Sequence, residues 1–545
     1  MHRFVKVHNC LASLTLAAAL VLALPFGRAQ VSTANAEQSA APLQLNARLI
    51  VLDVVVTDAN GKPVNDLTEK DFEVFEDGVK QRIRSVEPPS AHTLPATSVA
   101  AGATQVFDPA QPASFGLAPV TVLLLDEANT HFADSSFARR QIHDYLAKQP
   151  ALLPQPTNLL SVYDGHFKQL QSFTRDRDAL LKALSSAPTE YAWKLEINGS
   201  TEDGPIERLD QSLRALEQIS QSYARIKGRK NLIWVGGGFP TLDPTTFDGD
   251  EDLEIRNTLR HVTDVLLETR VTLYAVDPTS SAAGLTEITS PEQLSFAEAA
   301  GDALTVGSDP FNASEDFDRL GPVTGGRVVR GRNDIAKQIA DSVDLGANFY
   351  TLSYSPSSKD TSAAKYRKIK VLCLRPGLTA TTRNGYYPKL GESESSPETA
   401  SYDLSVAAES SVPLNGLRVT AAPRESPETT TSTFIVRVGA ADLVWKPADD
   451  GTSMASVYIM AASMDAKNKM IGHVTQAMKA TAKSGTDLHA ASHFADFIVV
   501  APTNSKAKSL RFVVRDSASG KMGSADVSLT GAGISAPGVI GINPK

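Results

Sequence analysis

The feature that most constrains the fold of this chain is a series of short apolar runs, separated by segments of helical periodicity, between residues 118 and 388. The run Val120–Leu125 is almost wholly apolar, which is typical of a strand buried on both faces. Similar runs occupy Asn231–Val235 and Val271–Val276, and Ile206–Ile226 carries apolar residues at helical spacing. Strands that alternate with helices predict an α/β domain over 118–388, built on a doubly wound, mostly parallel sheet.

β-rich regions are expected on both sides of this domain. Residues 43–88 combine short strand-like runs with Asn-Gly and Asp-Gly turn signals, which predicts a small β module. Residues 412–532 hold several short β-like runs separated by Gly, Pro and Asp, which predicts a β-sandwich. The segments 89–117 and 389–411 are rich in small and polar residues and are expected to be linkers.

The start of the chain predicts export. A short positive segment and the apolar run Leu11–Leu24 are followed by small residues that offer one cleavage site before Gln30 and another before Glu37. This order is the layout of a secretory signal peptide, expected at residues 1–29. An uncleaved anchor is the alternative, but the run is shorter than the roughly 20 apolar residues that a membrane span needs. Since no later segment of the sequence suits a span, we expect an exported protein, periplasmic or extracellular, without a membrane span.

Charge and cysteine content exclude several classes of protein. The formal net charge is −8 and no block rich in Lys and Arg occurs, so a nucleic-acid partner is not expected. Cys10 lies in the expected signal peptide, which leaves Cys373 alone in the mature chain and excludes a disulfide scaffold. The sequence contains neither a nucleophile elbow nor a Walker loop, and its histidines show no metal-ligand spacing, so we expect no enzyme activity.

The predicted sheet indicates one ligand-facing crevice. In an open α/β sheet, ligands bind beyond the carboxyl ends of the strands, where the strand order reverses. Asp126–Thr130 follows the first strand, Gly236–Gly238 follows the fourth, and Asn198–Thr201 precedes the long helix and could form a third side. The candidate ligand-binding residues are therefore Asp126, Asn129, Thr130, Ser200, Thr201, Gly236 and Gly237.

The same residues also suit purely structural roles. Asn129 or Thr130 could cap the helix that follows, and Asp126 could accept hydrogen bonds from N–H groups of its own loop. The glycines at 236–238 could form a tight turn. These roles are compatible with ligand binding, and the sequence leaves both open.

The strand that ends in Asp126-x-Ala128-x-Thr130 resembles the start of a von Willebrand factor A (VWA) domain. Over roughly residues 45–388, further segments are similar to the VWA-related family described from acidobacteria. These segments are Asp71–Gly78, Leu123–Asp126, Gly228–Phe239, Leu273–Pro278, Thr324–Arg327 and Tyr350–Pro356. That family has no established reaction, so the resemblance implies a fold and a mode of binding without a catalytic step.

The resemblance also implies a metal-ion-dependent adhesion site. In VWA domains, an Asp-x-Ser-x-Ser motif, a Thr from a second loop and an Asp after the fourth strand hold Mg²⁺, and a carboxylate of the protein partner completes the coordination. In this chain Asp126 and Thr130 match the first and last motif positions and are the candidate metal ligands. Ser200 or Thr201 could supply the hydroxyl of the second loop.

This chain departs from the adhesion motif at two positions. Ala128 has no oxygen where the family has a Ser, and Gly236 or Gly237 stands where the family has an Asp. Asp277 ends a strand two positions away in the sheet, about 9–10 Å from Asp126 at normal strand spacing. Because Mg²⁺ requires near-octahedral oxygen coordination, the sequence predicts a degenerate adhesion-type site and leaves metal binding open.

We therefore expect a non-enzymatic binding protein of the cell envelope, whose α/β domain recognises a protein partner, as in adhesion. Two alternatives come from other classes. A structural or carbohydrate-binding protein would use the C-terminal sandwich, where Trp445 and Tyr458 are the most visible aromatic residues. An envelope hydrolase with a noncanonical site would require Ser, His and Asp to converge in one cleft.

Overall fold

A computed structural model of the chain describes most residues between 49 and 529. The described ranges are 49–95, 107–163, 166–190, 192, 204–238, 249–278, 317–358, 366–388, 397–424, 433–448, 450–502 and 504–529. The expected signal peptide at 1–29 and the candidate residues Ser200 and Thr201 lie outside these ranges. Within the described part of the chain, no helix is both long enough and apolar enough to cross a membrane.

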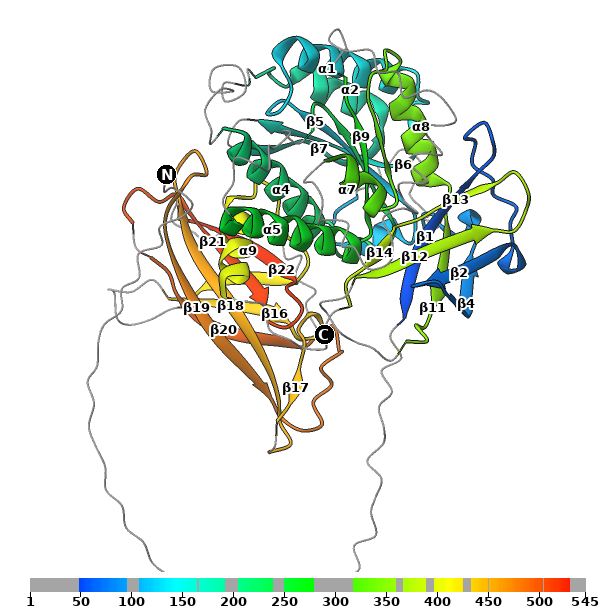
Figure 1. The fold of residues 1–545 in the computed structure, drawn as a ribbon. Helices are drawn as coiled ribbons and strands as arrows, with labels where there is room; N and C mark the ends of the chain where they lie inside the picture. Colours follow the sequence, from blue (N-terminus) through cyan, green and yellow to red (C-terminus); the bar gives the residue numbers. More distant parts are fainter. Residues whose placement is uncertain are drawn as a thin grey trace, which may run out of the picture. The chain divides into compact units, whose positions relative to one another are not determined.

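A six-stranded sheet forms the centre of the α/β domain (Figure 1). Its strands are β5 (Val120–Asp126), β6 (Leu152–Tyr163), β7 (His166–Asp176), β8 (Lys230–Val235), β9 (Val271–Val276) and β10 (Arg327–Val329). They lie in the order β10-β9-β8-β5-β6-β7, and all neighbours are parallel except β6 and β7. The strand order reverses between β5 and β8, which confirms the doubly wound, mostly parallel sheet expected from the sequence.

Helices cover both faces of this sheet, and β5 shows why its sequence is continuously apolar. Val120, Val122 and Leu124 join the core on one face, whereas Leu123 and Leu125 join the core on the other. Successive side chains of a strand point to opposite faces, so a strand between two helical layers must be apolar at nearly every position. The first face carries α4 (Gly204–Ser222), α5 (Gly249–Glu268) and α7 (Phe317–Val323); the second carries α1 (Phe132–Ala147), α2 (Arg177–Ser186) and α8 (Ile335–Ala347).

The N-terminal β module is completed by strands that follow α8. Strand β1 (Ile50–Thr57) pairs with β11 (Tyr350–Tyr354), with Leu52 opposite Leu352. Two four-stranded sheets result, β13-β1-β11-β4 and β14-β12-β2-β3, and they share one apolar core. The other elements are η1 (Glu69–Asp71), β2 (Phe72–Glu76), β3 (Val79–Gln81), β4 (Ile83–Glu87), η2 (Pro89–Ala91), β12 (Arg367–Cys373), β13 (Thr379–Thr381) and β14 (Gly385–Tyr386).

This pairing corrects the expected boundary between the first two domains. The segment 350–388 is expected within the α/β domain at 118–388, but its strands complete the module at 43–88. The last element of the α/β domain itself is α8, which ends at Ala347. The physical reason is that 43–88 alone offers too few apolar side chains to bury a sheet, and the strands at 350–388 supply the missing half.

Both segments expected as linkers contain helical turns and buried side chains. In 89–117, Phe107 and η3 (Pro112–Phe115) precede β5, and both phenylalanines are buried in the α/β core. In 389–411, helix α9 (Pro397–Glu409) packs against α4 and β21. The polar composition of that segment conceals Leu404, Ala407 and Ala408, whose helical spacing creates one apolar face toward the C-terminal domain.

The C-terminal domain is made of two antiparallel sheets packed face to face. One has the order β15-β16-β20, and the other has the order β17-β18-β21-β22, with β19 also paired to β18. The rings of Phe434 and Phe512, one from each sheet, have centroids 5.0 Å apart in the shared core. The elements are β15 (Val419–Pro423), β16 (Thr433–Gly439), η5 (Ala440–Asp442), β17 (Lys446–Pro447), β18 (Ser453–Met464), β19 (Met470–Ala482), β20 (Phe494–Val500), β21 (Ser509–Asp516) and β22 (Met522–Ser528).

Candidate functional site

Asp126 ends β5, and its side chain is fully buried at the carboxyl edge of the sheet. Its Oδ1 accepts hydrogen bonds from the backbone N–H groups of Ala128 at 3.0 Å and Asn129 at 2.9 Å. Its Oδ2 accepts a hydrogen bond from Nε1 of Trp234 at 3.0 Å. The carboxylate therefore folds its own loop into a local turn, which is the structural role that the sequence allows for it.

Burial controls the acidity of this carboxyl group. Removal from water disfavours the charged form and raises the pKa of Asp126 from 3.8 to about 6, although the hydrogen bonds from Asn129, Trp234 and Ala128 act in the opposite direction. At neutral pH the group is mostly ionised, and these three N–H donors stabilise its negative charge.

Thr130 and two glycines interlock the loops that follow β5 and β8. Thr130 Oγ1 accepts a hydrogen bond from the backbone N–H of Gly237 at 2.8 Å. A Cβ atom at Gly236 would lie 2.4 Å from Cβ of Asp126, and one at Gly237 would lie 2.3 Å from the carbonyl oxygen of Asn129. The glycines are required here because any side chain would push the two loops apart.

Asn129 connects the loop to helix α4. Its Nδ2 donates a hydrogen bond to Oγ of Ser212 at 2.9 Å, and its buried Oδ1 has no hydrogen-bond partner among the described residues. Helix α1 begins at Phe132, and its N-cap residue is His131, which makes no side-chain capping hydrogen bond. The expectation that Asn129 or Thr130 caps this helix is wrong, because both side chains bind other segments instead.

The structure brings together the candidate residues of the first and fourth strands. Asp126 binds the N–H of Asn129, Thr130 binds the N–H of Gly237, and Gly236 lies close against Asp126 and Thr130. Trp234 and Ser212 could not be identified as site residues from the sequence. Trp234 belongs to the apolar strand β8 and Ser212 to helix α4, and the patterns of both elements indicate packing alone. Trp234 is 108 positions from Asp126, so their hydrogen bond has no local signature.

The residues of this loop do not fit an octahedral Mg²⁺ ion. The ion needs about six oxygen ligands. The side chain of Ala128 supplies none, both oxygens of Asp126 are engaged by N–H donors, and the Thr130 hydroxyl accepts from a backbone N–H. Asp277 directly follows β9, which lies two strands from β5, and its carboxylate lies 4.0 Å from Nε of Arg330.

An exposed segment follows this buried group directly. His131 and Phe132 are exposed at the start of α1, and 43% of Phe132 is accessible to solvent. Buried Glu127 ties the loop to α1, because its Oε1 lies 2.8 Å from Nη2 of Arg139 in the middle of that helix. The loop thus presents an aromatic side chain on a base fixed by hydrogen bonds and an ion pair.

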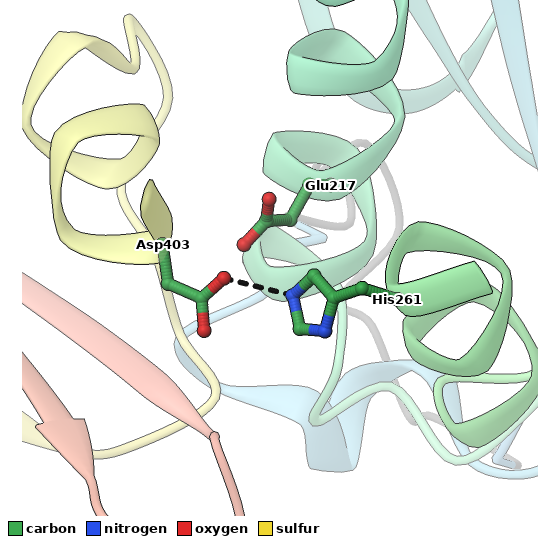
Figure 2. Close-up of side chains that lie close together, drawn as sticks. All are labelled: Glu217, His261 and Asp403. Carbon is green, nitrogen blue, oxygen red and sulfur yellow. Dashed lines mark hydrogen bonds and ion pairs between the residues drawn. The ribbon is translucent and has the colours of Figure 1, made fainter. Parts of the chain in front are cut away.

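A second group of polar side chains is buried where α4, α5 and α9 meet (Figure 2). Glu217, His261 and Asp403 point toward one another from these three helices. Nε2 of His261 lies 2.8 Å from Oδ1 of Asp403, and Nε of Arg515 donates to Oδ2 of Asp403 at 2.6 Å. Both oxygens of Glu217 are buried and lack a hydrogen-bond partner within the described ranges. No local pattern in the sequence indicates this group, because His261 and Asp403 are 142 positions apart.

Burial and mutual charge set the pKa values in this second group. Burial, reinforced by the charge of Asp403, raises the pKa of Glu217 well above 4.5. Burial opposes the charged form of His261, but the hydrogen bond and charge of Asp403 outweigh it and raise the pKa of His261 to about 9. Burial likewise opposes the charge of Asp403, yet contacts with His261 and Arg515 hold its pKa below 3.8.

Comparisons with known proteins give little further guidance. No protein-family model matches this chain, and no curated protein matches its sequence. The crystal structure of the SpRpn10 VWA domain is similar to part of the chain, with 13% sequence identity, a TM-score of 0.16 and coverage of 30% of this chain and 89% of that one. A likeness this slight carries no argument about function.

Proposed function

We propose that this chain is an exported, non-enzymatic binding protein whose VWA-like α/β domain contacts a protein partner at the carboxyl ends of β5 and β8. The segment Asp126–Phe132 is the centre of the proposed contact. It lies where the strand order reverses, which is the position that open α/β sheets use for ligands. The motif that resembles a VWA domain ends in the same segment.

The observation that carries this proposal is the exposure of Phe132 directly after a loop that is already fixed. The Asp126 carboxylate and the Thr130 hydroxyl hold the loop through hydrogen bonds within the protein. A loop held in one conformation before binding loses little conformational entropy on association. Aromatic side chains are enriched at the centres of protein interfaces, so Phe132 suits a protein partner. The proposed contact therefore does not depend on a metal ion.

A buried histidine near β11 takes part in a polar network with Thr351 and Asp53. Thr351 Oγ1 lies 3.1 Å from Nε2 of His92 and donates its proton to Oδ1 of Asp53, also at 3.1 Å. The Thr351 hydroxyl therefore contacts both the His92 ring and the Asp53 carboxylate. Arg270 pairs with the same Asp53 carboxylate. These contacts form a structural polar network.

The carbohydrate-binding alternative gains no support from the aromatic residues of the C-terminal domain. Trp445 packs against the core, and its Nε1 donates to the carbonyl oxygen of Ala440 at 2.8 Å. Tyr458 is half-buried against a neighbouring apolar cluster. Among the exposed large hydrophobic residues of the described C-terminal strands, Phe494 is the aromatic one. A single exposed ring does not make the flat aromatic platform that sugar binding requires.

Quantitative capture tests the proposed contact. Mature protein is immobilised and exposed to envelope extract of the source organism, and the captured proteins are measured by mass spectrometry. Phe132→Ala is expected to reduce capture of a specific partner about ten-fold, as for a residue at the centre of an interface. Leu152→Ala is the matched control, because Leu152 is 63% exposed at the start of β6, at the opposite edge of the sheet. The proposal would be refuted if both variants lost capture of the partner equally, or if capture was unchanged in both.

Export is tested independently of binding. The protein recovered outside the cytoplasm is expected to begin at Gln30, or at the alternative site Glu37, as shown by the mass of its N-terminal peptide. Recovery of the intact N-terminus from the cytoplasm alone would refute export and would leave the contact at Phe132 to be judged by the capture experiment.

A further inference from the structure

We infer that Glu217, His261 and Asp403 form a binding site for one dication of the first transition row, such as Zn²⁺ (Figure 2). Each residue offers one ligand atom, and these atoms all lie within 4.8 Å of one another. Ligands of Zn²⁺ at about 2.0–2.2 Å are separated by about 3–3.5 Å in a tetrahedral site. Small rotations of the three side chains therefore suffice to receive the ion.

The carboxylate of Glu217 provides the first independent reason for a cation. Its side chain is completely buried, points into the group, and has neither oxygen hydrogen-bonded to a described residue. Asp126, which is equally buried, has three N–H donors. A buried carboxylate whose oxygens accept no hydrogen bond is unfavourable. An ion between Glu217 and His261 would coordinate an oxygen of Glu217 that is otherwise left without a partner.

Arg515 provides the second reason. It is 1% exposed, and its Nε binds Oδ2 of Asp403 at 2.6 Å, which leaves Oδ1 directed at His261. Carboxylates that ligate a metal are commonly held through their other oxygen in this way. Asp403 is therefore already oriented as a ligand through a single oxygen, and the ion would take the place of the direct contact between Asp403 and His261.

The donor set selects the class of ion. One imidazole nitrogen with two carboxylates suits Zn²⁺ and its first-row neighbours, whereas Mg²⁺ and Ca²⁺ favour oxygen ligands throughout. The side chain of His261 is 26% exposed, so the group can be reached from solvent on that side.

The position of the group indicates what the ion does. Glu217 and His261 belong to α4 and α5 of the α/β domain, whereas Asp403 belongs to α9, whose apolar face packs on the C-terminal sandwich. Binding of the ion would cross-link these helices. Because a site assembled from three helices does not exist in the unfolded chain, the ion stabilises the folded state.

Metal titration of the mature protein, produced without a histidine tag and freed of metal by chelation and dialysis, tests this inference. Titration calorimetry is expected to show that one Zn²⁺ ion binds per chain. Thermal unfolding is expected to show a higher melting temperature in the presence of Zn²⁺. Glu217→Gln and His261→Gln are each expected to weaken Zn²⁺ binding at least about ten-fold, as loss of a ligand exceeds the effect of altering its neighbours. Glu409→Gln is the matched control, because Glu409 lies at the end of α9, the helix that contains Asp403. This variant is expected to bind Zn²⁺ like the unaltered protein.

Two results would overturn the inference. One is failure of the unaltered protein to take up Zn²⁺ or Co²⁺, a measurement that needs no variant to fold. The other is unchanged Zn²⁺ affinity in Glu217→Gln. A metal-free group with a protonated Glu217 predicts both results, together with a Glu217→Gln protein at least as stable as the original.

Discussion

Nε1 of Trp234 lies 3.0 Å from Oδ2 of Asp126, so an indole group from β8 donates a hydrogen bond to the carboxylate that ends β5. Both side chains are fully buried. The backbone N–H groups of Ala128 and Asn129 bind the other oxygen of the same carboxylate. The proposed binding loop is thus held by groups of the protein itself, and we infer that it keeps its conformation without a bound ion.

A double-mutant cycle measures this contact. Asp126→Asn keeps the shape of the side chain, but its NH₂ group must face either Trp234 Nε1–H or the loop N–H groups. We expect a loss of about 1–3 kcal/mol in the free energy of unfolding, as for a buried group left unsatisfied. In a Trp234→Phe background the NH₂ group no longer faces an indole N–H, so the same substitution should cost less. Urea denaturation of the four proteins gives the coupling energy, and strictly additive effects would argue against the contact.

The raised pKa of Asp126 predicts how stability varies with pH. Its pKa is 3.8 in the unfolded chain and about 6 in the folded protein, so the folded state binds the proton more tightly. The stabilisation from this proton is complete below pH 3.8 and is lost as the pH rises through 6. A difference of this size corresponds to about 3 kcal/mol. The stability of the original protein relative to Asp126→Asn should therefore fall between pH 4 and pH 6 in urea denaturation, and a flat difference would mean that Asp126 has an ordinary pKa.

Gly236 should tolerate no side chain. The Cβ atom of Gly236→Ala would lie 2.4 Å from Cβ of Asp126 and 2.7 Å from Oγ1 of Thr130. We expect a loss of about 1–3 kcal/mol, typical of overpacking in a core. Gly472→Ala is the control, because nothing lies within 4 Å of its Cβ position. Thermal unfolding of both variants decides the point, and an equally small effect at the two positions would contradict the interlocked loops.

Magnesium should leave the protein unchanged, because the loop offers too few free oxygen ligands. An ion present at 100 times its Kd would stabilise the folded state by about 2.7 kcal/mol. We expect no shift in the melting temperature at millimolar Mg²⁺, either in the original protein or in Asp126→Ala. A shift in the original protein that disappears in Asp126→Ala would restore the metal-dependent adhesion site.

The sequence predicts the parts of this fold that depend on local patterns. The unbroken apolar run at Val120–Leu125 identifies a strand covered on both faces, and the order of strands and helices then selects the crevice at Asp126. Helix α9 could not be predicted from composition, because the small and polar residues around Leu404 outnumber the apolar residues on its buried face. Local reasoning therefore fails where a segment is held chiefly by its neighbours.

Contacts between distant segments could not be predicted from one sequence. The pairing of Leu52 with Leu352 joins β1 and β11, which lie far apart in the sequence, and no local pattern specifies that register. The contact between His261 and Asp403 depends on how three helices pack. The same limit applies to Trp234, whose role at Asp126 arises only when β5 and β8 become neighbours.

Site-specific photo-crosslinking tests the central claim most directly. A photoreactive amino acid is placed at position 132 or, as the control, at position 152 of the mature protein, and each is irradiated in envelope extract with Mg²⁺ or with EDTA. We predict that the photoreactive residue at position 132 yields a discrete crosslinked protein of the same mass and amount in Mg²⁺ and in EDTA. The residue at position 152 should yield no such product. Equal crosslinking at both positions, or crosslinking at position 132 that EDTA abolishes, would contradict a metal-independent contact at the end of β5.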